Sequence, residues 1–439
     1  MFMNDNLLKL RLISCLNKLA YAARDADEPV IRVKKMMTTT PHKTERLHAL
    51  DSLRAIMMML GLVLHSVLTY IGGEPYAAWK IRDPLYFNTN LEWLSSWIHV
   101  FRMPIFMVVA GFFASLLFYE RGERRMIKNR MNRITYPFLV FVVILFVPVV
   151  GGMNWTEAVF ASNPDALNEA LGGFNSLSSL LPERTMHLWF LYYLILFSVA
   201  SFALGVLFKQ LPMVSALVHR AFEAVFKRPI LRLMVFTLIT VGILLVMDRY
   251  WVKTSTGFTP DFDTFIFYFF FYLFGWVLFK SKSLLSSFKK HDWLFTLTGL
   301  ALFSWYFFTD RSEMELWMFM SIRSLCCWLF IFGITGLFIR YGSNHSAAMR
   351  YVSDSSYWVY LIHLPLAIVI PGLIADWSLP GAVKFLFVMT ITAVICFATY
   401  HFFVRSTFIG KFLNGRKYSK KLSDIKHVVG PKIEPVLQK

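Results

Sequence analysis

The chain has 439 residues, of which 56% are hydrophobic and 16% are charged. Soluble domains have roughly 25% charged residues, and one core of this size could not bury so much apolar surface. The composition therefore excludes an ordinary soluble protein and predicts an all-α, polytopic transmembrane helical bundle. The net charge of +18 would suggest nucleic acid binding in a soluble protein, but basic loops between membrane helices explain it better. We expect membrane lipids, and no nucleic acid, as partners.

The chain divides into three parts by composition. Residues 1–45 are polar and mixed, and we expect a disordered cytoplasmic extension there. The apolar segments fill 46–405, which we predict to be the transmembrane domain. The Lys-rich end, 406–439, is expected to be a basic cytoplasmic tail along the anionic inner leaflet.

Ten apolar segments follow one another in the middle part, and several are long enough to cross a hydrocarbon layer of roughly 30 Å. We therefore predict about ten transmembrane helices. The segments cover residues 50–72, 91–118, 134–151, 187–208, 231–251, 262–279, 293–309, 316–339, 356–375 and 382–404.

The connections between these segments alternate in charge. The stretch 119–133 reads YERGERRMIKNRMNR, with six Lys or Arg residues and two Glu, and the connections 209–230 and 280–292 are also basic. The intervening connections 152–186 and 310–315 are richer in acidic residues. Because Lys and Arg collect on the cytoplasmic side, this pattern predicts that both chain ends are cytoplasmic.

The first apolar segment carries Asp51, Arg54 and His65, and ionisable groups inside a membrane usually face a cavity or a partner. At about 100° per residue, Arg54 and His65 lie within about 20° of each other, and Asp51 lies about 60° from Arg54. All three therefore share one helix face. A salt bridge at the membrane boundary would also explain Asp51 and Arg54, and a helix–helix hydrogen bond would explain His65.

The second segment carries His99 and Arg102 on one face. Counted along antiparallel helices, His99 and His65 reach a similar depth. Arg102 in mid-span indicates either a structural ion pair or an anion site.

Two later segments carry further histidines. His187 and Trp189 are predicted at the outer interface, where an aromatic belt is the alternative to a site. His363 is predicted nearer the inside, two residues before Pro365, whose ring frees a backbone carbonyl.

The sequence has no zinc motif, phosphate-binding loop, nucleophile elbow or dinucleotide fingerprint in a plausible context. Three of its four cysteines, Cys326, Cys327 and Cys396, lie in apolar segments and are interpreted as small buried residues. We therefore expect no metal site and no permanently bound cofactor.

The segment ERLHALDSLRAIMMMLGLVLH resembles the opening helix of the acyltransferase family 3 membrane enzymes. The segment WIHVFRMPIFMVVAGFFASLLF is similar to the second helix of that family, and Arg130 and Arg133 match its Arg-x-x-Arg motif. HLWFL and VYLIHLPL are similar to later helices, so the resemblance spans about 45–405. The second-helix and HLWFL stretches look closest to members that act in glucan biosynthesis.

The resemblance implies an enzyme of the bacterial inner membrane that transfers groups other than amino-acyl groups. The donor would be acyl-coenzyme A, carrying succinyl or acetyl, and the acceptor a hydroxyl of a cell-envelope or osmoregulated periplasmic glycan. His65 would be the base, because a neutral imidazole suits proton abstraction near pH 7. The other expected catalytic residues are Asp51, Arg54, His99 and Arg102. The expected donor-binding residues are Arg125, Arg130 and Arg133, and the expected substrate-binding residues are His187, Trp189 and His363.

The runner-up hypothesis is a proton-coupled transporter or flippase for a sugar or lipid-linked substrate, since ionisable residues on membrane helix faces also suit a carrier. The inverted hydropathy halves typical of many carriers are not visible in this sequence. The oligomeric state stays open.

Overall fold

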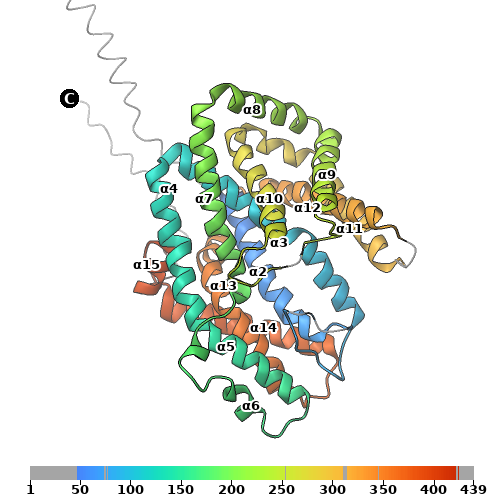
Figure 1. Ribbon diagram of the computed structural model, residues 1–439, viewed down its shortest axis with the longest axis vertical. Coiled ribbons are helices and arrows are strands. Elements are labelled where there is room, and N and C mark those ends of the chain that lie inside the picture. The colour runs from blue at the N-terminus through green and yellow to red at the C-terminus, as the bar shows by residue number, and fades with distance from the viewer. Residues whose placement is uncertain are drawn as a thin grey trace, which may run out of the picture. The chain divides into compact units, whose positions relative to one another are not determined.

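The computed structural model describes residues 47–73, 76, 78–252, 254–309, 314–344, 346–421 and 424. The expected extension over 1–45 lies outside these residues. Within them the chain is helical, which confirms the all-α fold (Figure 1). The α-helices are α2 (His48–Val67), α3 (Thr89–Arg121), α4 (Glu123–Arg130), α5 (Tyr136–Phe160), α6 (Ala166–Gly172), α7 (Trp189–Gln210), α8 (Pro212–Phe226), α9 (Pro229–Val246), α10 (Phe262–Lys280), α11 (Asp292–Phe308), α12 (Leu316–Tyr341), α13 (Ala347–Leu373), α14 (Gly381–Thr399) and α15 (Phe408–Asn414).

Short helices of other types join these elements. The 3-10 helices are η1 (Leu68–Tyr70), η3 (Ser178–Leu180), η4 (Met186–Leu188) and η5 (Lys282–Lys290), and the π-helices are η2 (Met131–Thr135) and η6 (Tyr400–Val404). Among the described residues, nine helical runs are long and apolar enough to cross a membrane. The predicted segment 293–309 forms α11, which has 17 residues and is shorter than those nine.

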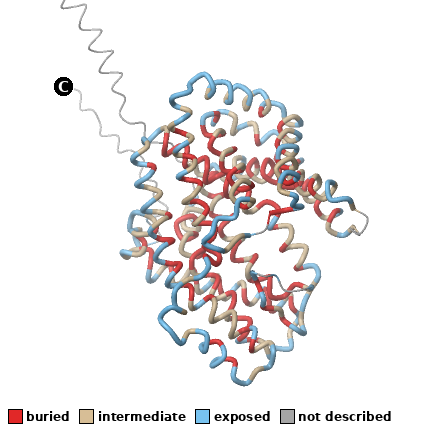
Figure 2. The backbone as a smooth tube through the Cα atoms, in the orientation of Figure 1, coloured by how far each residue is buried: buried red, intermediate tan, exposed pale blue. Residues whose placement is uncertain are grey.

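Helices α2 and α3 are among the most buried spans of the protein. The apolar stretch of α3 is 78% buried and that of α2 is 67% buried, whereas that of α9 is only 28% buried. Figure 2 shows the same contrast between the buried middle and the exposed margins. Gly111 of α3 and Gly275 of α10 permit very close packing, because a Cβ on either one would overlap the backbone of the other helix.

Two predicted boundaries are wrong. The stretch 119–133, expected to be a loop, is helical apart from a break at Gly122, whose φ is 92°. Its Glu, Met, Arg and Lys residues are good helix formers. The third span does not end at 151 but continues to Phe160, because α5 packs on α13: the buried Thr156 hydroxyl donates to the Ile368 carbonyl at 2.9 Å.

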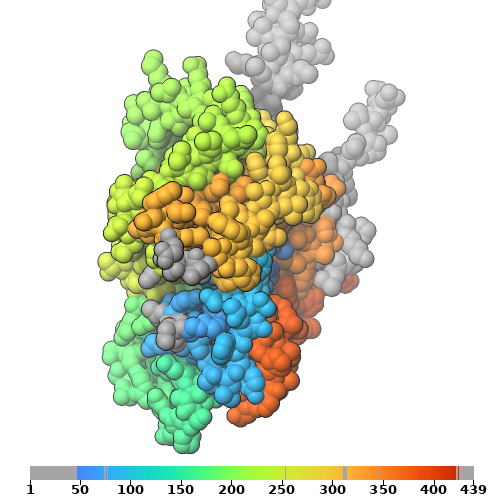
Figure 3. Space-filling view, turned by 90° about the vertical axis from the view of Figure 1, so that its right-hand side faces the viewer, coloured from blue at the N-terminus to red at the C-terminus, as the bar shows by residue number. Residues whose placement is uncertain are grey.

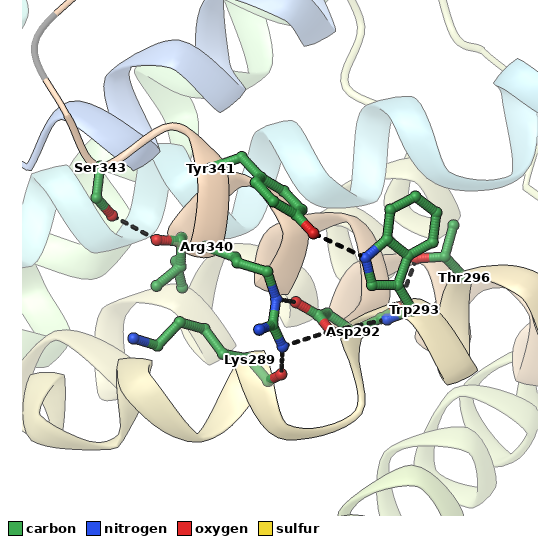
Figure 4. A network of polar contacts seen from close by, with 8 residues as sticks. Lys289, Asp292, Trp293, Thr296, Arg340, Tyr341 and Ser343 are labelled. Atoms are coloured by element: carbon green, nitrogen blue, oxygen red, sulfur yellow. Dashed lines mark hydrogen bonds and ion pairs between the residues drawn. The ribbon is translucent and has the colours of Figure 1, made fainter.

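Helices α11 and α12 form a hairpin that an ion pair closes at one end (Figure 4). Arg340 Nε donates to Asp292 Oδ2 at 2.5 Å, and Arg340 Nη2 donates to Asp292 Oδ1 at 2.9 Å. Trp293 Nε1 also donates to the Tyr341 hydroxyl at 3.1 Å. The two-pronged contact fixes the register of α11 on α12.

The loop between η1 and α3 is attached to α14 by a buried ion pair. Lys384 Nζ lies 2.9 Å from Asp83 Oδ2, and their side chains are 0% and 3% exposed. Lys384 also donates to the Ala375 carbonyl at 3.1 Å. Figure 3 shows the segment that leads into α3 (blue) beside α14 (orange-red). The pair holds this loop, with the buried Trp79, in place.

Candidate active site

The centre of the site is a pair of histidines from α2 and α13. His65 Nδ1 lies 2.9 Å from His363 Nε2, and the two rings are nearly parallel, with an angle of 8° between their planes. The prediction that His363 lies nearer the inside than His65 is therefore wrong. Helix α13 begins at Ala347, well before the predicted start, so His363 lies about 24 Å along it, at the level of His65.

Hydrogen-bond partners assign the protons of this pair. His363 Nδ1 lies 2.8 Å from the Tyr360 carbonyl and 3.1 Å from that of Val359. A carbonyl only accepts, so His363 Nδ1 carries the proton and Nε2 has a lone pair. His65 Nδ1–H donates to that lone pair. The neutral His65 therefore has a free lone pair on Nε2, which is the nitrogen that can take up a proton.

His187 lies beside this pair. Its Nε2 donates to the Leu361 carbonyl at 3.0 Å, its own carbonyl accepts from the Tyr360 hydroxyl at 2.8 Å, and its ring centroid is 5.5 Å from that of His363. The predicted place of His187 at the outer interface stays a prediction, but the side chain is buried in the protein. Two hydrogen bonds with α13 hold η4 against that helix.

The three histidines line one cavity of about 30 Å³ together with Arg102 and Trp189. Its other lining residues are Met57, Met58, Met103, Phe106, Phe190 and Tyr360. A volume of this size holds little more than a water molecule. Three methionines in the wall supply flexible side chains that can rearrange around a larger ligand.

Arg102 is the cation of this cavity. No described residue forms a hydrogen bond or ion pair with it, and its Nε is buried without a partner. The guanidinium passes closely over Gly61 of α2: a Cβ at that position would lie 2.5 Å from Arg102 Nη1. A buried cation without a counter-ion is costly, and this one is well placed for an anion or a developing negative charge.

Trp79 was not predicted from the sequence. Its ring stacks on that of His65, with centroids 5.7 Å apart and an angle of 23° between planes, and the side chain is buried. One feature of the sequence could have indicated that this loop is fixed. Lys384 is an ionisable residue in an apolar segment, and its partner Asp83 lies four residues after Trp79. That signal predicts a fixed loop, although not which residue covers His65.

Three predicted catalytic residues do not contact the histidine cluster. Asp51 and Arg54 pair with each other at 3.5 Å, but Arg54 precedes His65 by eleven residues, or about 16 Å along α2. His99 Nδ1 donates to the Ser95 carbonyl at 2.8 Å and the ring is exposed. Among the described residues, no hydrogen bond or ring contact joins His99 to His65, although the two rings lie close enough for their charges to interact.

The predicted donor-binding arginines differ in their surroundings. Arg133 Nη1 donates to the carbonyls of Lys411 and Phe412 at 3.3 and 3.1 Å, and so caps α15. Arg125 is exposed on α4. Arg130 has buried Nε and Nη2 atoms without a partner among the described residues, and it lies close enough to Arg54 for the two charges to repel. Arg54 and Arg130 thus form a second cationic group.

Comparisons with known proteins identify the family of this chain. A family model described as an acyltransferase domain matches residues 47–401. The chain is 24% identical over 386 residues to proteins named "Glucans biosynthesis protein C" from Salmonella paratyphi B, Salmonella agona and Salmonella enteritidis. Each match covers 82% of this chain and 92% of the relative. No solved structure matches the chain. With its membrane-spanning helices, the chain therefore belongs to the acyltransferase 3 family of multi-pass membrane acyltransferases.

Proposed function

We propose that this acyltransferase moves a succinyl or acetyl group from acyl-coenzyme A, on the cytoplasmic side of the bacterial inner membrane, to a hydroxyl of a cell-envelope glycan. The observation that carries the proposal is the His65–His363 pair, which leaves one basic nitrogen free in a cavity that also holds Arg102. The name of the relatives in Salmonella favours a glucan as the acceptor.

The chemistry follows from these side chains. The acceptor hydroxyl gives its proton to His65 Nε2 as its oxygen attacks the thioester carbonyl. The tetrahedral intermediate carries an oxyanion, which the Arg102 guanidinium stabilises. When the carbon–sulfur bond breaks, the proton on His65 Nε2 passes to the departing thiolate. The ester and the free thiol of coenzyme A are the products, and the enzyme returns to its starting protonation state.

Substitution of Gly61 tests whether catalysis depends on the position of the Arg102 guanidinium. In Gly61→Ala, the new methyl group overlaps the Arg102 guanidinium, which must move because it is the flexible partner. We expect kcat to fall between about ten- and a hundredfold, since small misplacements of catalytic groups have effects of this size. Gly242→Ala in α9 is the control, because no atom lies within 4 Å of the added Cβ. Equal kcat for the two variants and wild type would refute the role of this contact.

The donor's phosphates are assigned to the cationic group formed by Arg54 and Arg130, with Arg125 and Arg133 nearby. Coenzyme A is a polyanion, and guanidinium groups bind phosphate in a two-pronged manner. The unpartnered N–H groups of Arg130 favour it as the main contact. Arg133 already donates to two α15 carbonyls, so we assign it a smaller contribution to phosphate binding. This group would lie at the cytoplasmic side, with both chain ends.

Arg130→Gln should raise the KM for acyl-coenzyme A about tenfold or more with little change in kcat, because a charged hydrogen bond to phosphate is lost. Arg133→Gln should have a smaller effect. Lys289→Gln with Lys290→Gln removes two basic residues elsewhere and serves as the control. Steady-state kinetics in proteoliposomes measures all of these. The same rise in KM for the control would indicate a general charge effect and no site.

The function itself can be tested with purified protein in proteoliposomes. Succinyl- or acetyl-coenzyme A is added outside or inside with a β-glucan oligosaccharide, and thiol release and ester formation are followed together. We expect equal amounts of thiol and glycan ester. Sugar flux without ester formation would instead support a carrier. Mass spectrometry of envelope glycans from a deletion strain would identify the acyl group and the acceptor.

A further inference from the structure

Pro365 interrupts the hydrogen-bond pattern of α13 at the active site. A proline has no backbone N–H, and its ring displaces the carbonyl four residues earlier. That carbonyl belongs to Leu361, and it accepts from His187 Nε2 at 3.0 Å. The His187 side chain, which comes from η4, therefore supplies the hydrogen bond to the Leu361 carbonyl that a backbone N–H at position 365 would otherwise supply.

We infer that Pro365 is a positioning residue that fixes the tautomer of His187, so that His187 Nδ1 accepts a hydrogen bond from a substrate O–H or N–H group. Because the Leu361 oxygen only accepts, His187 Nε2 must carry the proton and Nδ1 must have a lone pair. His187 Nδ1 is buried and has no partner among the described residues.

The two hydrogen bonds of His187 make this orientation rigid. The Tyr360 hydroxyl donates to the His187 carbonyl at 2.8 Å, while the His187 ring donates back to the neighbouring Leu361 carbonyl. The ring lines the cavity of His65 and Arg102. Since Nε2 is occupied, Nδ1 is the ring nitrogen that remains for a ligand there. An unpaired buried acceptor costs about 1–3 kcal/mol, so a ligand donor at this point is favourable.

This inference rests on the proposed acyl transfer, because that reaction offers two sources of a donor group. One is a second hydroxyl of the glycan acceptor, beside the hydroxyl that gives its proton to His65. The other is an amide N–H of the pantetheine arm of coenzyme A. Either group would donate to the lone pair of His187 Nδ1. A carboxylate or carbonyl oxygen has no proton to donate, so it would be rejected at this point. The kinetic parameter that changes tells the two sources apart.

Pro371 in the same helix is a matched control. It also lacks an N–H, but none of the described histidines bonds the carbonyl that it frees, that of Ala367. The neighbouring Ile368 carbonyl accepts from the Thr156 hydroxyl of α5. Pro365→Ala and Pro371→Ala each add one backbone N–H, which can donate to the carbonyl four residues earlier in the helix. Both straighten α13, but only Pro365→Ala adds a competitor for the carbonyl that holds His187.

The test measures kcat and both KM values for these variants in proteoliposomes, with acetyl- or succinyl-coenzyme A as donor and a β-glucan oligosaccharide as acceptor. Pro365→Ala should lower kcat/KM about tenfold, the effect of one hydrogen bond, and Pro371→Ala should not. A raised acceptor KM would identify the glycan hydroxyl as the donor group, and a raised donor KM the pantetheine amide. Equal effects of the two prolines would overturn the inference.

Two substitutions of His187 cover the case in which Pro365→Ala misfolds. His187→Gln keeps a donor and an acceptor on one side chain but does not titrate, whereas His187→Phe keeps neither. We expect His187→Gln to retain activity within about tenfold of wild type and to leave the pH profile unchanged, and His187→Phe to be much weaker. Equally low activity of the two variants would overturn the inference. An inactive wild type would refute the proposed function as well.

Discussion

His65→Gln should lower kcat of acyl transfer by about 10² to 10⁴, the usual contribution of a general base. Glutamine can still donate a hydrogen bond to His363 Nε2, but it has no nitrogen that takes up a proton. The variant should insert, fold and bind acyl-coenzyme A like wild type, because Arg54 of the cationic group is about 16 Å away along α2.

The measurement is initial-rate kinetics with saturating donor, together with thermal unfolding to confirm folding. His401→Gln is the control, since His401 lies in η6 and contacts Tyr351 at 3.3 Å, away from the cavity. A near-normal kcat for His65→Gln would make His65 a packing residue, and His187 would then be the better candidate for the base. Loss of activity in His401→Gln as well would indicate a general effect of histidine replacement.

Arg102→Gln is expected to lower kcat by about 10² to 10³, because it removes the charge that faces the oxyanion. Glutamine has a shorter reach and no charge, so it cannot replace the guanidinium. The loss should be present at saturating concentrations of both substrates, since the negative charge develops only during reaction. Arg102→Lys should recover part of the activity, because it keeps the charge but not the planar geometry.

Arg249→Gln is the control for this pair of variants. Arg249 is 63% exposed and pairs with Asp263 at 3.3 Å, so its loss removes one positive charge without touching the cavity. If Arg102→Gln raised a KM and left kcat unchanged, Arg102 would bind a ground-state anion and would have no role in the transition state.

Several residues of the candidate site could be predicted from the sequence because ionisable groups in membrane helices are rare. His65, Arg102, His187 and His363 were all selected for that reason, and the structure brings them around one cavity. The helical bundle itself followed from the long apolar segments. These signals are local in the chain, so they need no knowledge of which helices are neighbours.

The remaining features depend on contacts between distant segments. The predicted depth of His363 was wrong because α13 begins at Ala347, so that a polar stretch extends the helix beyond its apolar part. The distance of Arg54 from the cavity follows from its position along the helix. The hydrogen bonds of Arg133 to α15 carbonyls, in contrast, depend on where the C-terminal residues pack. Trp79 was missed because a loop residue has no periodic pattern, and its position depends on long-range contacts such as the Asp83–Lys384 pair.

The sequence separation between the two histidines has a consequence for biosynthesis. His65 and His363 are 298 residues apart, and the Asp83–Lys384 pair spans 301. Membrane helices are made in chain order, so a nascent chain that has inserted everything up to α12 holds His65 without the residue that orients it. The site is completed only when α13 and α14 have joined the bundle. Partly made copies should therefore be unable to hydrolyse the cell's acyl-coenzyme A while they await their last helices.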